Sequence, residues 1–141
     1  MTAGVYVHVP FCLTRCGYCD FNAYAGLDHL ASPYVSALLR EAELAAPGWS
    51  GEEIASVFLG GGTPTTLEVA DLKALLARLR QGYAVAPNVE VTIEANPDTV
   101  DLPKLEGLLE AGFARLSMGR QSCSPRVLAS RWPLHDRASA R

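Results

Sequence analysis

The sequence has no run of eighteen apolar residues, and its N-terminus has no basic segment followed by an apolar stretch and a cleavage site. These absences argue against a membrane-spanning helix and an export signal, so we expect a cytoplasmic protein. Internal repeats and low-complexity tracts are also missing. Of the 141 residues, 49% are hydrophobic and 19% are charged, which is an ordinary balance for one globular domain.

Positive charge is sparse along most of the chain. The net charge is -3, and a basic excess occurs only in residues 115–141, where six arginines stand against Asp136. These arginines are spaced singly, without a basic run and with little aromatic interleaving. We therefore expect a solvated surface, or a stretch whose proper partner is missing, and no nucleic-acid partner.

Alternating strand and helix signals predict an α/β fold. Strand-like runs are expected over residues 5–9, 55–59, 89–93 and 113–118, and helices over residues 34–46, 68–80 and 101–109. Gly82 and Gly112 stand where helix C-terminal caps belong. About four βα units in a row, joined by short loops, indicate a parallel sheet.

Unusual residues follow each of the first three predicted strands. The cysteines come after the first, a run of glycines after the second, and the segment Glu94-Ala95-Asn96-Pro97 after the third. Because the carboxyl ends of parallel strands share one edge, we expect these motifs to meet there, with Glu94 in contact with a ligand. Gln121, just after the fourth strand, has the same position. His8, inside the first strand, is expected to be a hydrogen-bonded core residue.

Three cysteines have the spacing C-x3-C-x2-C, at Cys12, Cys16 and Cys19. Three thiolates can hold an iron-sulfur cluster and leave one iron open for another ligand. Alternatives are a structural zinc site completed by His8 or His29, or three plain thiols, but a second C-x2-C pair typical of zinc sites is absent. Disulfides are not expected in a cytoplasmic chain, and Cys123, far from the trio, is most simply an ordinary thiol.

The run Gly60-Gly61-Gly62-Thr63-Pro64-Thr65 predicts a tight strand-to-helix turn. Bare backbone would let a ligand approach closely, and exposed N–H groups ahead of a helix would attract a carboxylate or another anion. The run is not a phosphate-binding loop of the Gly-Lys-Ser/Thr kind, because that ending is absent.

Taken together, YVHVPFCLTRCGYCDF at 6–21, GGGTPT at 60–65 and TIEANP at 92–97 resemble the radical S-adenosylmethionine (SAM) superfamily. Within it, the motifs are similar to the oxygen-independent coproporphyrinogen III oxidase-like branch, and especially to the HemW haem chaperones. The resemblance is colinear from about residue 4 to residue 122. It implies part of a TIM-like (β/α)6 barrel, with about four βα units present.

The resemblance also implies a cofactor chemistry. A 4Fe-4S cluster would be held by Cys12, Cys16 and Cys19. The amino and carboxylate groups of SAM would chelate the iron that has no cysteine ligand. An electron from the reduced cluster would then split the sulfonium into methionine and a 5'-deoxyadenosyl radical, which abstracts hydrogen from a substrate. The SAM contacts it implies are Tyr6 at the methionine portion, Tyr18 against the adenine, Gly61, Gly62 and Thr63 along the cleft, Glu94 as a hydrogen-bond partner and Gln121 at the mouth.

One position separates two subfamilies. The anaerobic oxidases carry another cysteine two residues after the third ligand, where this sequence has Phe21, and the Cys19-Asp20-Phe21 ending resembles the haem chaperones. Those proteins bind haem and are thought to hand it to haem-requiring respiratory enzymes. The expected partners are thus SAM, haem or a porphyrinogen, and haem-accepting proteins. The alternatives are a coproporphyrinogen oxidase and an inactive fragment without chemistry.

The sequence departs from the family in length and in its last residues. Family members are more than twice as long, with six βα units and a porphyrin-handling C-terminal region. We expect residues 1–122 to form the N-terminal part of the core and residues 123–141 a divergent tail, with haem bound only where that region is present. Arg120 stands where the family usually has an apolar residue. The arginine that the resemblance implies as a cofactor contact falls near Pro133. An unpaired fourth strand would make the chain poorly soluble.

Overall fold

The structure, a computed structural model, describes residues 1–119, 124 and 126, and within them a parallel four-stranded sheet in the order β1-β4-β5-β6. The main strands are β1 (Thr2–Val9), β4 (Glu53–Gly61), β5 (Ala84–Ala95) and β6 (Arg115–Met118). A second small sheet pairs β2 (Phe11–Cys12) with β3 (Tyr24–Ala25). The α-helices are α1 (Ala31–Ala45), α2 (Val69–Gly82) and α3 (Leu102–Ala111), and the 3-10 turns are η1 (Asp28–Leu30), η2 (Ala46–Trp49), η3 (Pro64–Thr66) and η4 (Pro97–Thr99).

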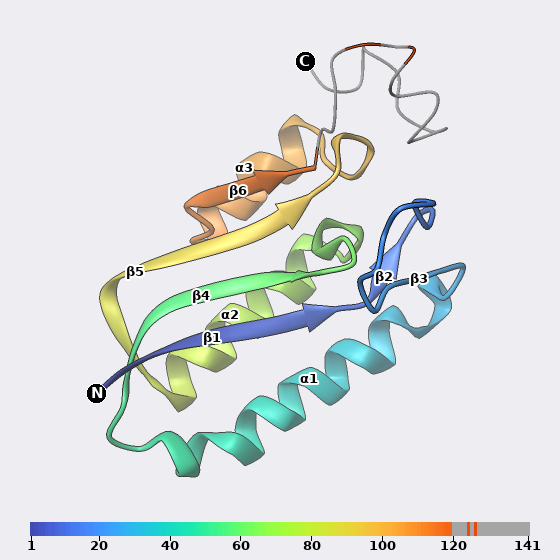
Figure 1. Cartoon of the computed structure of the whole chain (residues 1–141). Coiled ribbons are helices and arrows are strands. Elements are labelled where there is room, and N and C mark those ends of the chain that lie inside the picture. The colour runs from blue at the N-terminus through green and yellow to red at the C-terminus, as the bar shows by residue number, and fades with distance from the viewer. Residues whose placement is uncertain (120–123, 125, 127–141) are drawn as a thin grey trace.

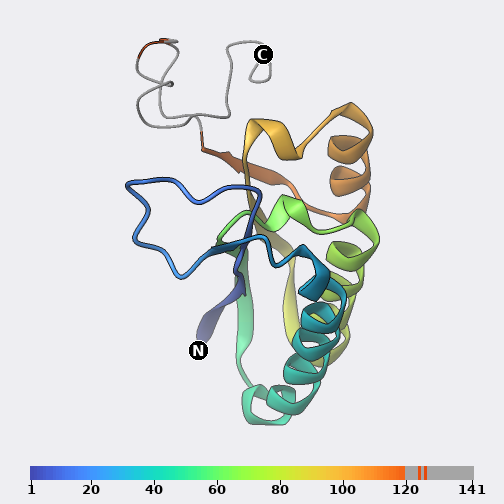
Figure 2. The ribbon, with the colours of Figure 1, turned by 90° about the vertical axis from the view of Figure 1, so that its right-hand side faces the viewer.

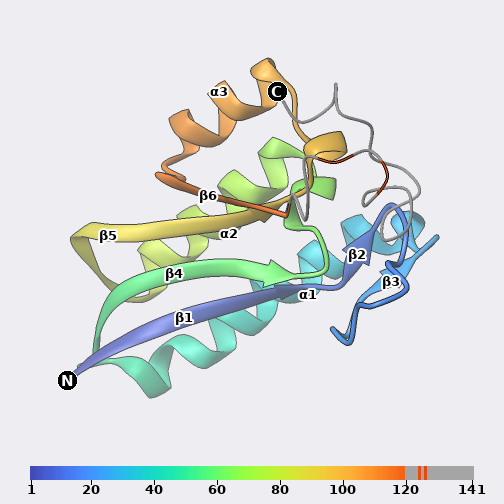
Figure 3. The same cartoon turned by 45° about the horizontal axis from the view of Figure 1, so that its top comes forward.

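The helices cover one face of the sheet and leave the other face open (Figure 1). Figure 2 shows the sheet from its side, with α1, α2 and α3 on one side and the loop after β1 extending on the other. In Figure 3 the strands run in the same direction toward β2 and β3. The expected α/β fold with a parallel sheet, as in part of a barrel, is confirmed.

Side chains alternate between the two faces because successive residues of a strand point to opposite sides. In β1, Val7 and Val9 are buried on the helix side, whereas Tyr6 is exposed and His8 half-buried on the open side. Buried residues of the sheet and of the helices that cover it form one core. They include Val9, Ile54, Val57, Leu59, Leu67, Leu72, Leu75, Leu76, Leu79, Val91, Ile93 and Leu108. The open face therefore carries the exposed and half-buried side chains of the strands.

The helix signals are largely confirmed. The residues of α2 that are buried are Leu72, Leu75, Leu76 and Leu79, as helical spacing requires, and Gly112 caps α3 in the left-handed conformation at φ 102°. Gly82 was a wrong prediction: it is the last residue of α2, and the cap is Tyr83 in an extended conformation. The reason is that β5 begins directly at Ala84, so the chain leaves the helix straight into a strand.

Strand β5 is longer than the strand predicted from the alternating apolar residues at 89–93. β5 includes Pro87, and its pairing with β4 shifts register between Ile54 and Ser56, whose partners are Val85 and Glu90. Proline has no N–H to donate to a ladder and is tolerated at such irregularities. The register shift therefore explains how a proline lies inside a paired strand.

Both edges of the sheet are open among residues 1–119, since β1 pairs only with β4 and β6 only with β5. Apolar side chains near the β6 edge are exposed, including Leu109 at 69% and Met118 at 41%. Such edges and patches normally pack against further structure. In the same part of the chain, no helix has the length and apolarity to cross a membrane.

Candidate functional site

The cysteine loop begins where β1 ends and is anchored by its neighbours. Phe11 packs edge-on against Tyr34 of α1 with ring centroids 5.3 Å apart, and the Tyr34 hydroxyl donates to the His8 carbonyl at 2.9 Å. The loop closes on itself where the N–H of Tyr24 donates to the Pro10 carbonyl at 2.7 Å. Helix α1 and the β2–β3 pair thus fix both ends of the segment that carries the cysteines.

One cavity of about 190 Å³ collects the motifs at the carboxyl ends of the strands. It is lined by the three cysteines and by residues from the turn after β4, from β5 and from β6: Cys12, Cys16, Cys19, Tyr18, Phe21, Gly61, Gly62, Thr63, Glu94, Asn96 and Ser117 are among them. The expectation that these motifs meet at the carboxyl ends of the strands is confirmed.

The three thiols are free and half-buried. Burial raises the pKa of the Cys12 thiol, and it raises the pKa of the Cys16 thiol, with Cys19 adding to both shifts. Neutral thiols are thus favoured in the metal-free protein. Metal binding requires thiolates, which the positive charge of bound iron stabilises, so loading such a site releases protons.

The described residues contain no set of three His, Cys, Asp or Glu side chains placed for one metal ion. In an iron-sulfur cubane each thiolate binds a different iron, so its ligands do not converge on a single atom. The zinc alternative would need His8, whose Nε2 lies 2.9 Å from the Asn22 carbonyl oxygen and whose Nδ1 lies 3.2 Å from the Tyr6 hydroxyl. His29 does not line the cavity. Neither histidine is placed to complete a zinc site.

The glycine turn is crowded at each of its three positions. A Cβ on Gly60 would lie 2.7 Å from the Glu94 carboxylate, one on Gly61 would lie 2.4 Å from the His8 ring, and one on Gly62 would lie 2.6 Å from a backbone oxygen. Gly61 also has φ 111°, which side chains rarely adopt. Close approach is therefore what the glycines provide here.

The amide groups of this turn serve the protein itself. The N–H of Gly62 donates to the Val9 carbonyl and that of Thr63 to the Phe11 carbonyl, both at 2.7 Å. The N–H of Gly61 donates to Glu94 Oε2 at 3.0 Å. The expected attraction of a carboxylate is met at Gly61 by the protein's own Glu94, whereas the N–H groups of Gly62 and Thr63 are not exposed, because they bond the cysteine segment.

Glu94 lies on the open face, out of phase with the buried Val91 and Ile93, as its position in the alternating strand predicted. Its register partner on β6 is Ser117, which also lines the cavity. The bond from Gly61 fixes one carboxylate oxygen. Glu94 thus presents a half-buried negative charge at the cavity wall.

Thr63 contacts the first cysteine, Cys12, and Asn96 contacts Thr63. Thr63 is 2% exposed, and its Oγ1 lies 3.6 Å from Cys12 Sγ and accepts a hydrogen bond of 2.9 Å from Asn96 Nδ2. Sequence reasoning did not assign Asn96 a role; its place at the end of β5, directly before Pro97, was the available signal. Arg15 and Ser117 also line the cavity and were not singled out.

The aromatic residues divide into two groups. Tyr18 and Phe21 line the cavity, and Phe21 is 68% exposed. Tyr6 does not line it: its ring stacks on Phe58, and its hydroxyl contacts His8. His8 was expected in the core and is hydrogen-bonded as predicted, but it lies on the open face, where it meets Gly61.

Two expected features fall outside the described residues, namely Gln121 as a SAM contact and Cys123 as an ordinary thiol. The same holds for Arg120 and Pro133 and for most of the expected tail, residues 123–141.

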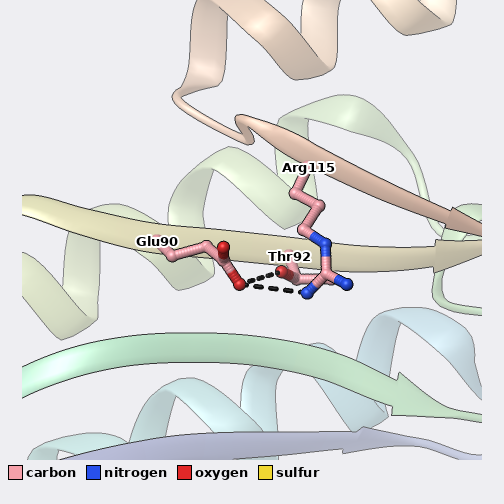
Figure 4. A network of polar contacts seen from close by, with 3 residues as sticks. All are labelled: Glu90, Thr92 and Arg115. Atoms are coloured by element: carbon pink, nitrogen blue, oxygen red, sulfur yellow. Dashed lines mark hydrogen bonds and ion pairs between the residues drawn. The ribbon is translucent and has the colours of Figure 1, made fainter.

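A polar network lies on the open face, away from the cysteines (Figure 4). Arg115 Nη1 and Glu90 Oε1 are 3.1 Å apart, and the Thr92 hydroxyl donates to the same oxygen at 3.2 Å. Both charged side chains are more than half exposed, so their pairing adds little stability. The network places polar side chains of β5 and β6 on the open face.

A family model described as the Radical SAM superfamily matches residues 6–138. The chain belongs to the radical SAM superfamily. A "Heme chaperone HemW" from Mycobacterium tuberculosis (strain H37Rv) is 44% identical over 136 residues, which cover 94% of this chain and 35% of that protein. The protein of the same name from Escherichia coli (strain K12) is 34% identical over 138 residues, covering 97% and 36%.

Two further likenesses lie outside the haem chaperones. An "Anaerobilin synthase" from Escherichia coli O157:H7 is 35% identical over 125 residues, covering 87% of this chain and 28% of that protein. A solved structure of coproporphyrinogen III oxidase (HemN) from Escherichia coli, described as a radical SAM enzyme, superposes with a TM-score of 0.89 at 34% identity, covering 96% of this chain and 32% of that one. The chain thus spans about a third of the length of the proteins it matches.

We predict that Gly61→Ala destabilises the protein by about 2 kcal/mol, because the methyl group meets the His8 ring and the backbone conformation is strained. Urea denaturation followed by circular dichroism measures the effect. Gly17→Ala is the matched control, since a Cβ there meets nothing within 4 Å. Equal midpoints for the two variants would contradict the crowded turn.

Proposed function

We propose that this chain holds a 4Fe-4S cluster on Cys12, Cys16 and Cys19, binds SAM beside it, and forms the N-terminal part of the core of a HemW-type haem chaperone. The observation that carries the proposal is the single cavity that the three cysteines share with the glycine turn and Glu94. Membership in the radical SAM superfamily supports it, since such proteins pair a cluster with SAM.

The residues present fit this cofactor pair. The trio supplies three soft ligands, which leaves one iron of a cubane without a protein ligand. Gly61 and Gly62 line the cavity with bare backbone, which would let a ligand approach closely. When bound and reduced, the cluster would supply the electron that splits the sulfonium of SAM.

The chain's own residues would bind and orient SAM. Glu94, held by the Gly61 amide, would accept hydrogen bonds from ribose hydroxyls or an ammonium group. Tyr18, 46% exposed at the cavity, would pack against the adenine. Gln121 would lie at the mouth. Tyr6, whose hydroxyl contacts His8, would touch the methionine portion of SAM.

Phe21 favours the haem chaperone over the oxidase. It occupies the position where the anaerobic oxidases carry a further cysteine, and it faces the cavity. The HemW proteins from two bacteria match nearly the whole chain. Haem and the haem-accepting proteins would meet the C-terminal region found in the longer relatives.

A coproporphyrinogen oxidase is the second candidate, because the HemN structure superposes with a TM-score of 0.89. It would take a porphyrinogen in place of haem. A fragment without chemistry is the third reading, and it predicts that no cluster assembles.

We predict that anaerobic reconstitution with iron and sulfide gives the chain the visible absorbance of a cluster and about four irons per chain. Cys16→Ala should abolish both, because two remaining thiolates cannot hold a cubane. Cys123→Ala, which removes the cysteine outside the trio, should retain both. Zinc, or unmetallated thiols under these conditions, would overturn the cluster assignment.

We predict that Glu94→Gln lowers the yield of 5'-deoxyadenosine about tenfold when SAM and dithionite are added to the reconstituted chain, because the loss of a charged hydrogen-bond acceptor weakens SAM binding. Product is measured by chromatography. Glu90→Gln, on the same strand and the same face, is the matched control and should leave the yield unchanged. A normal yield from Glu94→Gln would remove this residue from the SAM site.

We predict that haem binding needs the part of the relatives that this chain does not span. The chain alone should bind haem poorly in an absorbance titration, whereas a fusion to the C-terminal region of the Mycobacterium tuberculosis HemW should bind it. Haem-dependent transfer to an apo-haem protein should follow. If the fusion instead decarboxylates coproporphyrinogen III, the oxidase reading replaces the chaperone.

A further inference from the structure

Thr63 is a buried hydroxyl residue whose backbone is fixed on both sides. Its N–H donates to the Phe11 carbonyl at 2.7 Å, next to the first cysteine. Its carbonyl accepts from the Thr66 hydroxyl at 2.8 Å and from the Thr66 N–H at 2.9 Å. Because Thr63 is 2% exposed and its backbone is bonded on both sides, its hydroxyl has a defined place.

The Thr63 hydroxyl has two partners, and their chemistry assigns its proton. Asn96 Nδ2 donates to Thr63 Oγ1 at 2.9 Å, so the oxygen acts as acceptor on that side. Cys12 Sγ lies 3.6 Å away on the other. A thiolate that ligates iron has no proton to give, so the hydrogen bond must run from the Thr63 hydroxyl to Cys12 Sγ.

Asn96 is itself held in place by a group of threonines. Its N–H donates to Thr99 Oγ1 at 3.2 Å, and the Thr99 hydroxyl donates back to the Asn96 carbonyl at 2.8 Å. Thr99 Oγ1 also lies 2.6 Å from Thr65 Oγ1, and Lys104 Nζ donates to the Thr65 carbonyl at 2.6 Å. These contacts join the end of β5 to the turn after β4.

We propose that Thr63, oriented by Asn96, is a positioning residue that donates a hydrogen bond to Cys12 Sγ and raises the reduction potential of the cluster. The proposal rests on the cluster assignment made above. A hydrogen bond to a ligand sulfur stabilises the reduced cluster more than the oxidised one, because the reduced cluster is more negative. The Thr63 hydroxyl would then act on the ligand sulfur and not on SAM.

The experiment is a potentiometric titration of the reconstituted chain, with the reduced cluster measured by electron paramagnetic resonance. Thr63→Val keeps the shape but removes the donor, and Thr63→Ser keeps the donor. We expect the ratio of reduced to oxidised cluster at a fixed applied potential to fall about tenfold in Thr63→Val, a shift of about 59 mV to lower potential, and to recover in Thr63→Ser.

Two further variants separate this role from packing. Asn96→Leu removes the group that orients the hydroxyl and should lower the potential in the same direction by a smaller amount. Thr66→Val removes a hydroxyl from the same turn that bonds a backbone carbonyl instead of a sulfur, and should leave the potential unchanged. In resonance Raman spectra, the iron–cysteine stretching band should shift to higher frequency in Thr63→Val and Asn96→Leu only.

The outcomes are distinguishable. If every variant assembles a cluster and the potentials of Thr63→Val and the parent chain agree, the proposal is overturned while the cluster assignment stands. If Thr63→Val takes up no cluster, Asn96→Leu decides, and an unchanged potential there overturns the proposal. If the parent chain assembles no cluster, the proposed function itself fails.

Discussion

The site depends on the attachment of the glycine turn to the cysteine segment. Two short hydrogen bonds, from the N–H groups of Gly62 and Thr63 to the carbonyls of Val9 and Phe11, hold these stretches together although about fifty residues separate them in the chain. That distance of approach is available only because Gly62 has no Cβ, which would meet the backbone of the opposite segment. Without this contact, Cys12 would have no fixed relation to Thr63 or to Glu94.

The parallel sheet extends the same constraint to the rest of the site. Strands that run in one direction end at one edge, so the segments after β1, β4 and β5 meet without long connecting loops. The alternation of side chains then sends apolar residues such as Val91 to the helices and polar residues such as Glu90 and Glu94 to the open face. A ligand at the cysteines is therefore approached from the polar side, and the helices support the sheet from behind.

How far the sequence predicts this site differs between residues. The phase of Glu94 followed from the alternation of β5, and the shared cavity followed from strand order. The cap at Gly82 failed, because the helix runs directly into β5. Asn96 was not assigned a role, because its partner Thr63 is distant in sequence and only the packing of two strand ends brings them together. The expected contact of Tyr6 with SAM stays a prediction, and only the structure shows that its hydroxyl contacts His8 and its ring stacks on Phe58.

By itself, the sequence determined the residue types of the three motifs, the spacing of the cysteines and the succession of strands and helices, because these are local properties that follow from residue identity and periodicity. Only the tertiary structure decided where the hydrogen-bonding groups are directed. The amides of the glycine turn point to Glu94 and to the cysteine segment, and the Thr63 hydroxyl lies between Cys12 and Asn96. Such directions depend on φ and ψ at a few turn residues and on the register between strands, which no spacing of letters specifies.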